Sequence, residues 1–380
     1  MRVVLAPQEF KGSLTATEAA AAMAQGVRAA LPDAEIDSAP LADGGPGTVQ
    51  AVVTAAKGRH SYARVDGPLG APTDAIWGRI DGGRTAVIEM AAASGLLLLT
   101  PDRRDPRRAG TYGTGELIRA ALDAGVRRIL IGVGGSASND GGAGMAAALG
   151  VRFLDEHGQP LPSGGAALAH LARIDVTDLD PRLPGVEVIG LADVRNPLLG
   201  PQGASAVYGP QKGAGPAAVA ELERALANYA DIVARDVGVE IASVPAGGAA
   251  GGLAAGLIAF AGARLEPGVV RVAEAVRLRE RLTGAGLVIT AEGRLDRQSL
   301  FGKTVAGVAA LAREAAAPCL AVAGTVADEA DVRAIPGLTD VEAAAPAGMP
   351  LDEAMTRAAP LLTAATERLL RRHLARAERP

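Results

Sequence analysis

The chain has 380 residues, of which 49% are hydrophobic and 21% charged, and this balance predicts a globular protein of two domains. Its formal net charge of −4 and aromatic content of 2% argue against nucleic-acid binding, because neither a basic surface nor base-stacking platforms are available. No apolar stretch is long enough to cross a bilayer, and the single cysteine, Cys319, excludes an intrachain disulfide, so we expect a cytoplasmic protein without membrane contacts.

Short β-branched or leucine-rich runs alternate with alanine-rich runs along most of the chain. The former predict strands at Arg2–Ala6, Glu35–Ala39, Asp74–Ile80, Thr85–Met90, Arg128–Val133, Val186–Leu191, Leu287–Thr290 and Cys319–Ala323. The latter predict helices at Thr15–Ala30, Gly47–Ala56, Gly115–Ala124, Pro216–Ala234, Lys303–Ala315 and Pro350–Ala375. This alternation indicates an α/β architecture with largely parallel sheets.

One segment departs from this alternation. Asp81-Gly82-Gly83 separates two strand-like runs and is typical of a tight turn, so we expect an antiparallel hairpin there. The last hundred residues return to the simple strand and helix alternation of the first sixty. We therefore expect a discontinuous, Rossmann- or flavodoxin-like first domain, residues 1–64 with 282–380, and an inserted α/β domain, residues 65–281.

The use of lysine is the strongest functional signal. Only four lysines occur beside 34 arginines, and three of them, Lys11, Lys212 and Lys303, lie in glycine-rich loops. A compact ammonium group beside exposed backbone N–H groups suits a phosphate or a carboxylate. We therefore expect these loops to bind anions.

Two loops in the first fifty residues carry candidate residues. Lys11 and Ser13 precede a helix whose capping box is Thr15 with Glu18, and this helix end could hold an anion, although an ordinary capped helix with a solvated lysine is an equally good interpretation. Asp43 begins the second loop, where it could serve chemistry or simply cap the next helix.

The richest loop runs from Gly132 to Gly144. Gly132, Gly134 and Ala137 fit a dinucleotide fingerprint, with Asp155 near the place of a ribose-binding acid. Asp140 argues against this interpretation, because a carboxylate repels a pyrophosphate unless a divalent cation bridges the two. We prefer a loop that binds a metal and a phosphate.

Two further loops lie in the second half of the chain. Asp193 directly follows a predicted strand and could be a general base, a metal ligand or part of a turn before Pro197. The segment after Glu292 ends in Gly302-Lys303-Thr304, which imitates a P-loop, but Arg297 stands where that motif requires glycine. The four histidines lie outside all of these loops, which argues against a nucleophilic triad or a zinc site.

Together these motifs resemble the bacterial glycerate kinase family of the first type, which has neither a P-loop nor a ribokinase fold. The matching stretches are Ala6-Pro7, 10–14, 41–45, Gly47-Thr48, 134–137, 139–142, Asp193, 196–200, 209–214, 292–294, Asp296 and 301–304. The resemblance implies two α/β domains with the active site in the cleft between them. It also implies transfer of the ATP γ-phosphoryl group to D-glycerate with Mg²⁺, giving 2-phosphoglycerate, with 3-phosphoglycerate as the alternative.

On this resemblance we assign roles residue by residue. The catalytic residues are Asp193, Asp43 and Lys11, with either aspartate as the base, and the substrate-binding residues are Lys11, Ser13 and Arg294. The nucleotide-binding residues are Gly134, Gly135, Ser136, Asn139, Lys212, Lys303 and Thr304. The metal ligands are Asp140, Glu292 and Asp296. The expected partner is a small-molecule substrate, and the expected assembly is a monomer or a homodimer.

The chain departs from the family pattern at two places. Gln8 and Glu9 stand where the family has Asp-Ser, and Pro46 stands where it has glutamate. These changes leave two alternatives open. One is a catalytically silent homologue that binds glycerate or nucleotide, and the other, with less support, is an NAD-dependent oxidoreductase.

Overall fold

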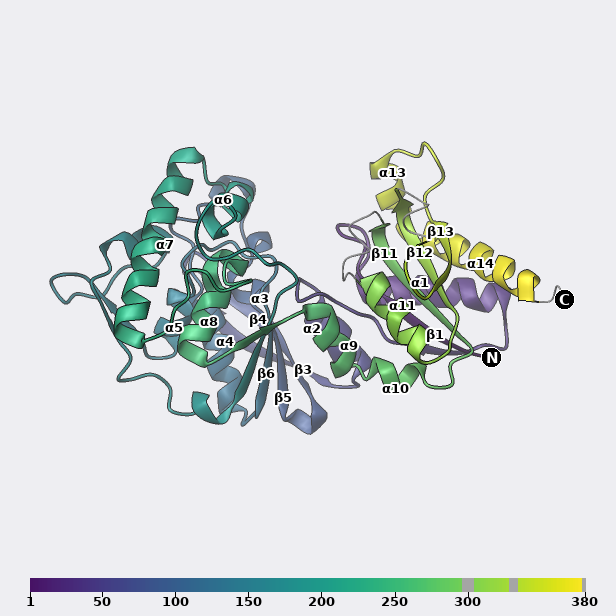
Figure 1. The fold of residues 1–380 in the computed structure, drawn as a ribbon, viewed down its shortest axis with the longest axis horizontal. Helices are drawn as coiled ribbons and strands as arrows, with labels where there is room; N and C mark the ends of the chain where they lie inside the picture. Colours follow the sequence, from purple (N-terminus) through teal and green to yellow (C-terminus); the bar gives the residue numbers. More distant parts are fainter. Residues whose placement is uncertain (296–303, 328–333, 378–380) are drawn as a thin grey trace. The chain divides into compact units, whose positions relative to one another are not determined.

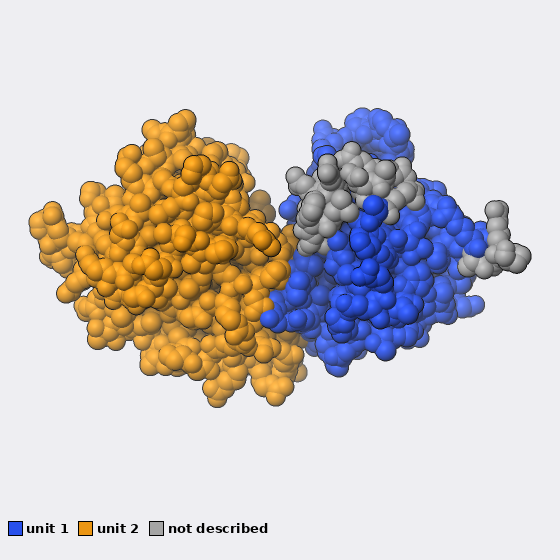
Figure 2. All heavy atoms as spheres, viewed as in Figure 1, with its two compact units in different colours: residues 1–42, 50–57, 269–380 blue, residues 43–49, 58–268 orange. Residues whose placement is uncertain are grey.

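The computed structural model describes residues 1–295, 304–327 and 334–377, and Figure 1 shows its helices and strands. The chain divides into two compact units, which Figure 2 colours separately. Unit 1 contains residues 1–42, 50–57 and 269–380, and unit 2 contains residues 43–49 and 58–268. The unit bounds thus differ from the expected domain bounds at residues 43–49, 58–64 and 269–281. The predicted α/β class with largely parallel sheets is confirmed.

Unit 1 is built on a five-stranded sheet in the order β13-β12-β11-β1-β2, and all its strand pairs are parallel. The strands are β1 (Arg2–Pro7), β2 (Glu35–Ser38), β11 (Leu287–Leu295), β12 (Cys319–Val326) and β13 (Leu338–Ala343). The inner strands are buried on both faces, which explains why they consist of continuous apolar runs. Cys319 is one of these buried residues, and burial raises the pKa of its thiol to about 12.

Helices cover both faces of this sheet. They are α1 (Ala16–Ala30), most of α2 (Thr48–Ala55) and α9 (Gly268–Ala275), α10 (Leu278–Leu282), α11 (Thr304–Glu314), α13 (Leu351–Thr356) and α14 (Ala358–Ala377). Alternate residues of β11, such as Leu287 and Ile289, join one core with α1 and α14, which Figure 1 shows together, while α11 contacts β11 and β12. A Cβ added to Gly26 of α1 would lie 2.4 Å from the carbonyl oxygen of Thr363, so glycine is needed there for α14 to pack so closely.

Unit 2 contains a six-stranded sheet in the order β10-β9-β6-β5-β4-β3. Its strands are β3 (Arg59–Asp66), β4 (Pro72–Ile80), β5 (Thr85–Glu89), β6 (Arg128–Gly132), β9 (Glu187–Leu191) and β10 (Arg264–Glu266), and a separate pair is formed by β7 (Arg152–Leu154) and β8 (Arg173–Asp175). The pairs from β5 to β10 are parallel, whereas β3, β4 and β5 are antiparallel. The hairpin predicted around Asp81–Gly83 is therefore confirmed, as β4 and β5.

The helices of unit 2 surround two apolar cores. They are α3 (Ala91–Ser94), α4 (Tyr112–Asp123), α5 (Ala143–Ala148), α6 (Ala204–Tyr208), α7 (Pro216–Val237) and α8 (Leu253–Ala261). One core lies on the large sheet, and the second surrounds Phe153, Tyr229 and Phe260 beneath α7. No helix within the described residues is both long and apolar enough to span a membrane.

The structure differs from the predicted elements at several places, and two of them have a clear local reason. The helix expected over Pro350–Ala375 is interrupted, because Pro360 has no N–H group to bond the carbonyl of Thr356, the last residue of α13. Strand β3 was not predicted, since most of its residues are polar and at least partly exposed, as an edge strand permits.

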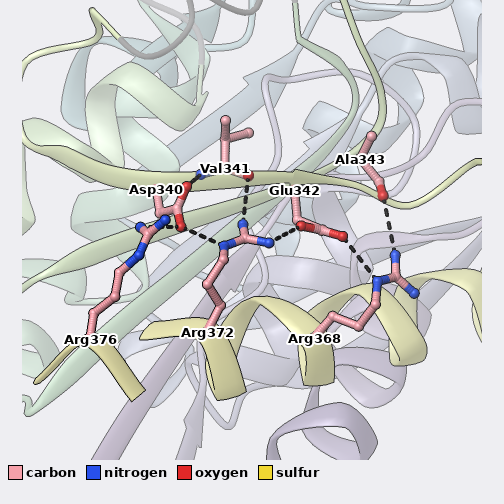
Figure 3. Close-up of polar contacts among 7 residues, drawn as sticks. All are labelled: Asp340, Val341, Glu342, Ala343, Arg368, Arg372 and Arg376. Carbon is pink, nitrogen blue, oxygen red and sulfur yellow. Dashed lines mark hydrogen bonds and ion pairs between the residues drawn. The ribbon is translucent and has the colours of Figure 1, made fainter. Parts of the chain in front are cut away.

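An ion-pair cluster joins α14 to the edge strand β13 (Figure 3). Arg372 and Arg376 both donate to Oδ2 of Asp340 at 2.9 Å, while Arg368 donates to Oε1 of Glu342 at 3.0 Å. The three arginines are spaced four residues apart, which places them along one side of the helix. Because Asp340 is only 3% exposed, its charge depends on these partners.

We therefore expect Asp340→Asn to lower the free energy of unfolding by about 1–3 kcal/mol, because the substitution removes the carboxylate that accepts from Arg376 and leaves Arg372 with the carboxylate of Glu342 alone. The measurement is chemical denaturation at pH 7. The matched control is Glu353→Gln, which breaks an exposed pair with Arg357 in the same unit and should cost less than about 1 kcal/mol. Equal effects of the two substitutions would contradict this account of Asp340.

Candidate functional site

In unit 1 the candidate residues gather where β1 and β11 end. Lys11 is exposed in the loop after β1, and the hydroxyl of Ser13 donates to the carbonyl of Phe10 at 3.0 Å. The predicted capping box of α1 is confirmed: Glu18 N–H donates to Thr15 Oγ1, and the Thr15 N–H donates to the Glu18 carboxylate, holding its pKa below the usual range. The loop is thus shaped by its own hydrogen bonds and leaves the Lys11 side chain exposed.

The end of β11 lies against this loop. Strand pairing aligns Pro7 with Ala291, and a Cβ added to Gly293 would lie 3.5 Å from Cα of Phe10. Glu292 is buried and Arg294 is exposed on either side of this glycine. The parallel register therefore brings Lys11 and Arg294 to the same edge of the sheet, as cations from two segments far apart in sequence.

Gln8 has a structural partner in unit 1. It is 8% exposed, and its side-chain oxygen accepts a hydrogen bond from the Thr304 hydroxyl at 2.5 Å. Thr304 begins α11, so an amide at position 8 connects the end of β1 to the start of that helix. Asp296 and Lys303 lie outside the described residues, and their roles stay predictions.

In unit 2 two glycine-rich loops pack directly on each other. A Cβ added to Gly132 would lie 2.3 Å from the carbonyl oxygen of Gly44, and one added to Gly134 would lie 2.7 Å from Cα of Gly45. The Gly134 N–H also donates to the Gly44 carbonyl at 3.1 Å. These glycines therefore allow another segment of the chain's own backbone to approach closely. The dinucleotide interpretation had explained the same glycines by the close approach of a pyrophosphate.

The other departure from the family pattern takes part in this packing. Gly135 has a φ of +75°, and a Cβ added there would lie 3.0 Å from Cγ of Pro46. The proline ring thus fills the space above a glycine that must adopt the left-handed conformation. Pro46 consequently has a packing role in place of a carboxylate.

Asp43 and Asp193 both lie beside Gly268. The Gly268 N–H donates to Oδ1 of Asp193 at 2.9 Å, and a Cβ added to Gly268 would lie 2.1 Å from the carbonyl oxygen of Asp43. Asp43 also accepts from the Gly45 N–H at 3.0 Å, which forms a turn ahead of α2. The structure thus brings the two aspartates proposed as the base to the same residue of unit 2.

Asp140 is an internal anchor. It is 1% exposed, and it accepts hydrogen bonds from the N–H and hydroxyl of Thr111 and from the N–H groups of Gly142 and Gly144, at 2.8–3.2 Å. Burial raises the pKa of this carboxyl, while the donated hydrogen bonds act in the opposite direction. Among the described residues no group of three or more His, Cys, Asp or Glu side chains is placed to hold a metal ion.

Lys212 lies inside unit 2, where the sequence had predicted a phosphate contact. The side chain is 1% exposed, and its ammonium donates to the Ser138 carbonyl at 2.6 Å. Burial lowers the pKa of Lys212 to about 7, although the nearby Asp140 charge opposes this shift. Asn139 is also buried, and its amide nitrogen donates to the Ser205 hydroxyl at 3.0 Å. In this structure these two side chains hold the loop after β6 together from within. Ser136, in the same loop, is 7% exposed.

Glu89 was not predicted from the sequence. Its carboxylate, at the end of β5, accepts from the Val49 N–H at 2.7 Å, and burial raises its pKa. The available signal was a charged residue directly after the apolar run Ala86–Ile88. Such a residue at the carboxyl end of a parallel strand marks the edge where α/β sheets place ligands.

Comparisons with known proteins agree on one family. A model of the glycerate kinase family matches residues 3–374. A glycerate kinase of Halalkalibacterium halodurans is 49% identical over 324 residues, which cover 85% of each chain, and a glycerate 2-kinase of Escherichia coli K12 is 46% identical over 332 residues, 87% of each chain. A crystal structure of a protein assigned as glycerate kinase 2 in Salmonella typhimurium LT2 superposes with a TM-score of 0.88 at 44% identity, covering all of both chains.

The buried ammonium of Lys212 predicts a pH dependence of stability. Its pKa of about 7 in the folded chain lies below the 10.5 of a free lysine, so the unfolded chain binds more protons between these values and stability rises with pH across this window. Lys212→Met cannot titrate and loses this rise. Between pH 7 and pH 9 we expect the wild type to gain about 2 kcal/mol relative to the variant in chemical denaturation.

The control for this measurement is Lys57→Met, which removes an exposed ammonium. It should leave the pH dependence of the wild type unchanged. If Lys212→Met and the wild type gain the same stability from pH 7 to pH 9, the shifted pKa is excluded.

Proposed function

Because the chain belongs to the glycerate kinase family, we propose that it transfers the γ-phosphoryl group of ATP to the 2-hydroxyl group of D-glycerate in the presence of Mg²⁺. The observation that carries this proposal is the family match across residues 3–374. The relative in Escherichia coli, named a glycerate 2-kinase, supports the 2-hydroxyl as the acceptor. The acceptor is a small molecule, and we place the reaction in the cytoplasm because the one cysteine is a buried thiol.

Lys11 and Arg294 suit the carboxylate of the acceptor. Both are exposed at the ends of adjacent parallel strands, and Ser13 adds a hydroxyl to the same loop. A carboxylate is held most strongly by charge-assisted hydrogen bonds from such cations. This binding would orient glycerate and raise the effective concentration of its hydroxyl group.

Asp193 and Asp43 suit the role of the base. A base must take the hydroxyl proton as the new phosphate ester bond forms, and it must be held in a fixed orientation. Asp193 is exposed, and its Oδ1 is oriented by the Gly268 N–H, whereas Asp43 is half-buried within its own turn. We therefore place Asp193 first and Asp43 second for this role.

The remaining residues would serve the nucleotide and its cation. Mg²⁺ is commonly held by one or two carboxylates together with phosphate oxygens, and it neutralises charge on the transferring phosphoryl group. Glu292 fits this requirement because it lies at the end of β11, and Asp296 follows it in sequence. Asp140 fits less well, because both of its oxygens already accept hydrogen bonds from the protein. The nucleotide would also contact the start of α11 at Thr304 and the loop after β6 at Gly134 and Gly135. That loop would be supported from inside by Ser136, Asn139 and Lys212.

The test of this function is phosphorus NMR of the products formed from D-glycerate, ATP and Mg²⁺. We expect ADP and 2-phosphoglycerate. A 3-phosphoglycerate signal would contradict the proposed acceptor hydroxyl, and ATP binding without any product would indicate a silent homologue. Tight NAD(H) binding without ATP binding would favour an oxidoreductase.

Two variants separate binding from chemistry. Lys11→Ala should raise the KM for glycerate by roughly 10- to 100-fold, because one charge-assisted contact is lost. Asp193→Asn should lower kcat by about 10²–10⁴ with a smaller effect on KM, because the base is lost. Lys57→Ala, which removes an exposed lysine elsewhere, is the control in steady-state assays. Wild-type kinetics for Asp193→Asn would remove it from the mechanism.

A further inference from the structure

A pocket of about 800 Å³ opens on unit 2, and its lining includes Gly213, the residue that follows Lys212. It is lined by two segments, residues 102–108 and 213–218, together with Leu69. Pockets that bind small molecules commonly measure about 300–1,000 Å³. The pocket is therefore large enough for a ligand of that class.

The charge of this pocket is positive. Four arginines line it, at positions 103, 104, 107 and 108, beside only two aspartates, Asp102 and Asp105. Asp105 is engaged by the guanidinium of Arg107 at 3.0 and 3.1 Å. Within the described part of the chain, the side chains of the other three arginines form no hydrogen bond or ion pair, and Nε of Arg104 is buried without an acceptor. A buried guanidinium nitrogen without an acceptor is costly, so an acceptor oxygen of a ligand would be stabilising at this point.

The N-terminal end of α7 opens into the same pocket. Gly215, Pro216, Ala217 and Ala218 line it, and this 22-residue helix begins with neither a side-chain cap nor an acidic residue in its first turn. The first N–H groups of a helix have no carbonyl partner within the helix, and its dipole favours an anion at this end. The helix thus adds to the attraction exerted by the arginines.

The two segments are joined by direct backbone packing. Gly213 has a φ of +97°, and a Cβ added there would lie 2.7 Å from the carbonyl oxygen of Arg104. Lys212, the preceding residue, is turned inward to the Ser138 carbonyl. At this loop the charge available to a ligand therefore comes from the arginines, whereas the sequence had pointed to the lysine.

We propose that this pocket binds a polyphosphate, namely the phosphate chain of the donor nucleotide. This inference rests on the proposed function. A single carboxylate would match only one of the three guanidinium groups that form no hydrogen bond, whereas a triphosphate carries enough acceptor oxygens for all three and for the helix end. No aromatic side chain lines the pocket, so its chemistry fits the phosphates and offers no stacking platform for the base.

The test uses sodium tripolyphosphate as the ligand of the full chain, measured by isothermal titration calorimetry without Mg²⁺. Ala217→Glu places a carboxylate at the pocket end of α7, and it should weaken binding by roughly tenfold or more through charge repulsion. The matched control is Ala220→Glu, the same change three residues further along α7 and outside the pocket lining, which should change binding less than about twofold. Both alanines are exposed, and an acidic residue in the first helical turn is favourable for folding. Ala217→Glu should therefore keep the melting temperature of the wild type.

The double variant Arg104→Gln with Arg108→Gln should also weaken tripolyphosphate binding. Because it changes different residues from Ala217→Glu, the result does not depend on one substitution. Equal affinities of the wild type, Ala217→Glu and the double variant, or no binding by the wild type, would overturn the proposal. If tripolyphosphate binds as expected but D-glycerate gives no product, the pocket stands and the proposed function fails. If glycerate is phosphorylated and Ala217→Glu leaves the KM for ATP unchanged, the pocket proposal fails alone.

Discussion

A carboxylate removed from water must be hydrogen bonded, and in unit 2 this constraint acts at Asp140. Its two oxygens bind Thr111, at the start of α4, and the backbone N–H groups that lead into α5. The loop after β6 is thereby fixed to two helices. Lys212 reaches the same loop from another segment through the Ser138 carbonyl. With the loop held from within, Gly132 and Gly134 present a fixed backbone on which the loop of Asp43 can pack.

The chain uses its two kinds of cation in different places. A lysine can lose its proton when it is buried, and the pKa of Lys212, lowered to about 7, shows the effect of such burial. A guanidinium group stays charged, so arginine needs solvent, a carboxylate or a ligand. Arg372 and Arg376 satisfy this need through Asp340, and the arginines of residues 103–108 lie at an open pocket. Lys212, one of the three lysines in glycine-rich loops, therefore has an interior contact, and its role toward a phosphate stays a prediction.

The two departures from the family pattern are accommodated by packing. Gln8 accepts the Thr304 hydroxyl, and Pro46 lies against Gly135. Each replaces a charged group with one that serves the local structure. The loops that surround them keep Lys11, Asp43 and Arg294, which supply charge at the sheet edges. The chain therefore retains the groups on which the proposed reaction depends.

The sequence by itself determined the α/β class, most strands and helices, the hairpin at Asp81–Gly83, the capping box of α1 and the family. These features follow from local rules, since apolar periodicity, turn glycines and caps act over a few neighbouring residues. It could not show that Lys212 and Asp140 are buried or that Glu89 carries a shifted pKa, because burial depends on segments far apart in the chain. It also could not show that Gly132 and Gly134 pack on Gly44 and Gly45 of the chain itself. Only the tertiary structure decided which polar residues face inward, because side chains compete for burial after the sheets have formed.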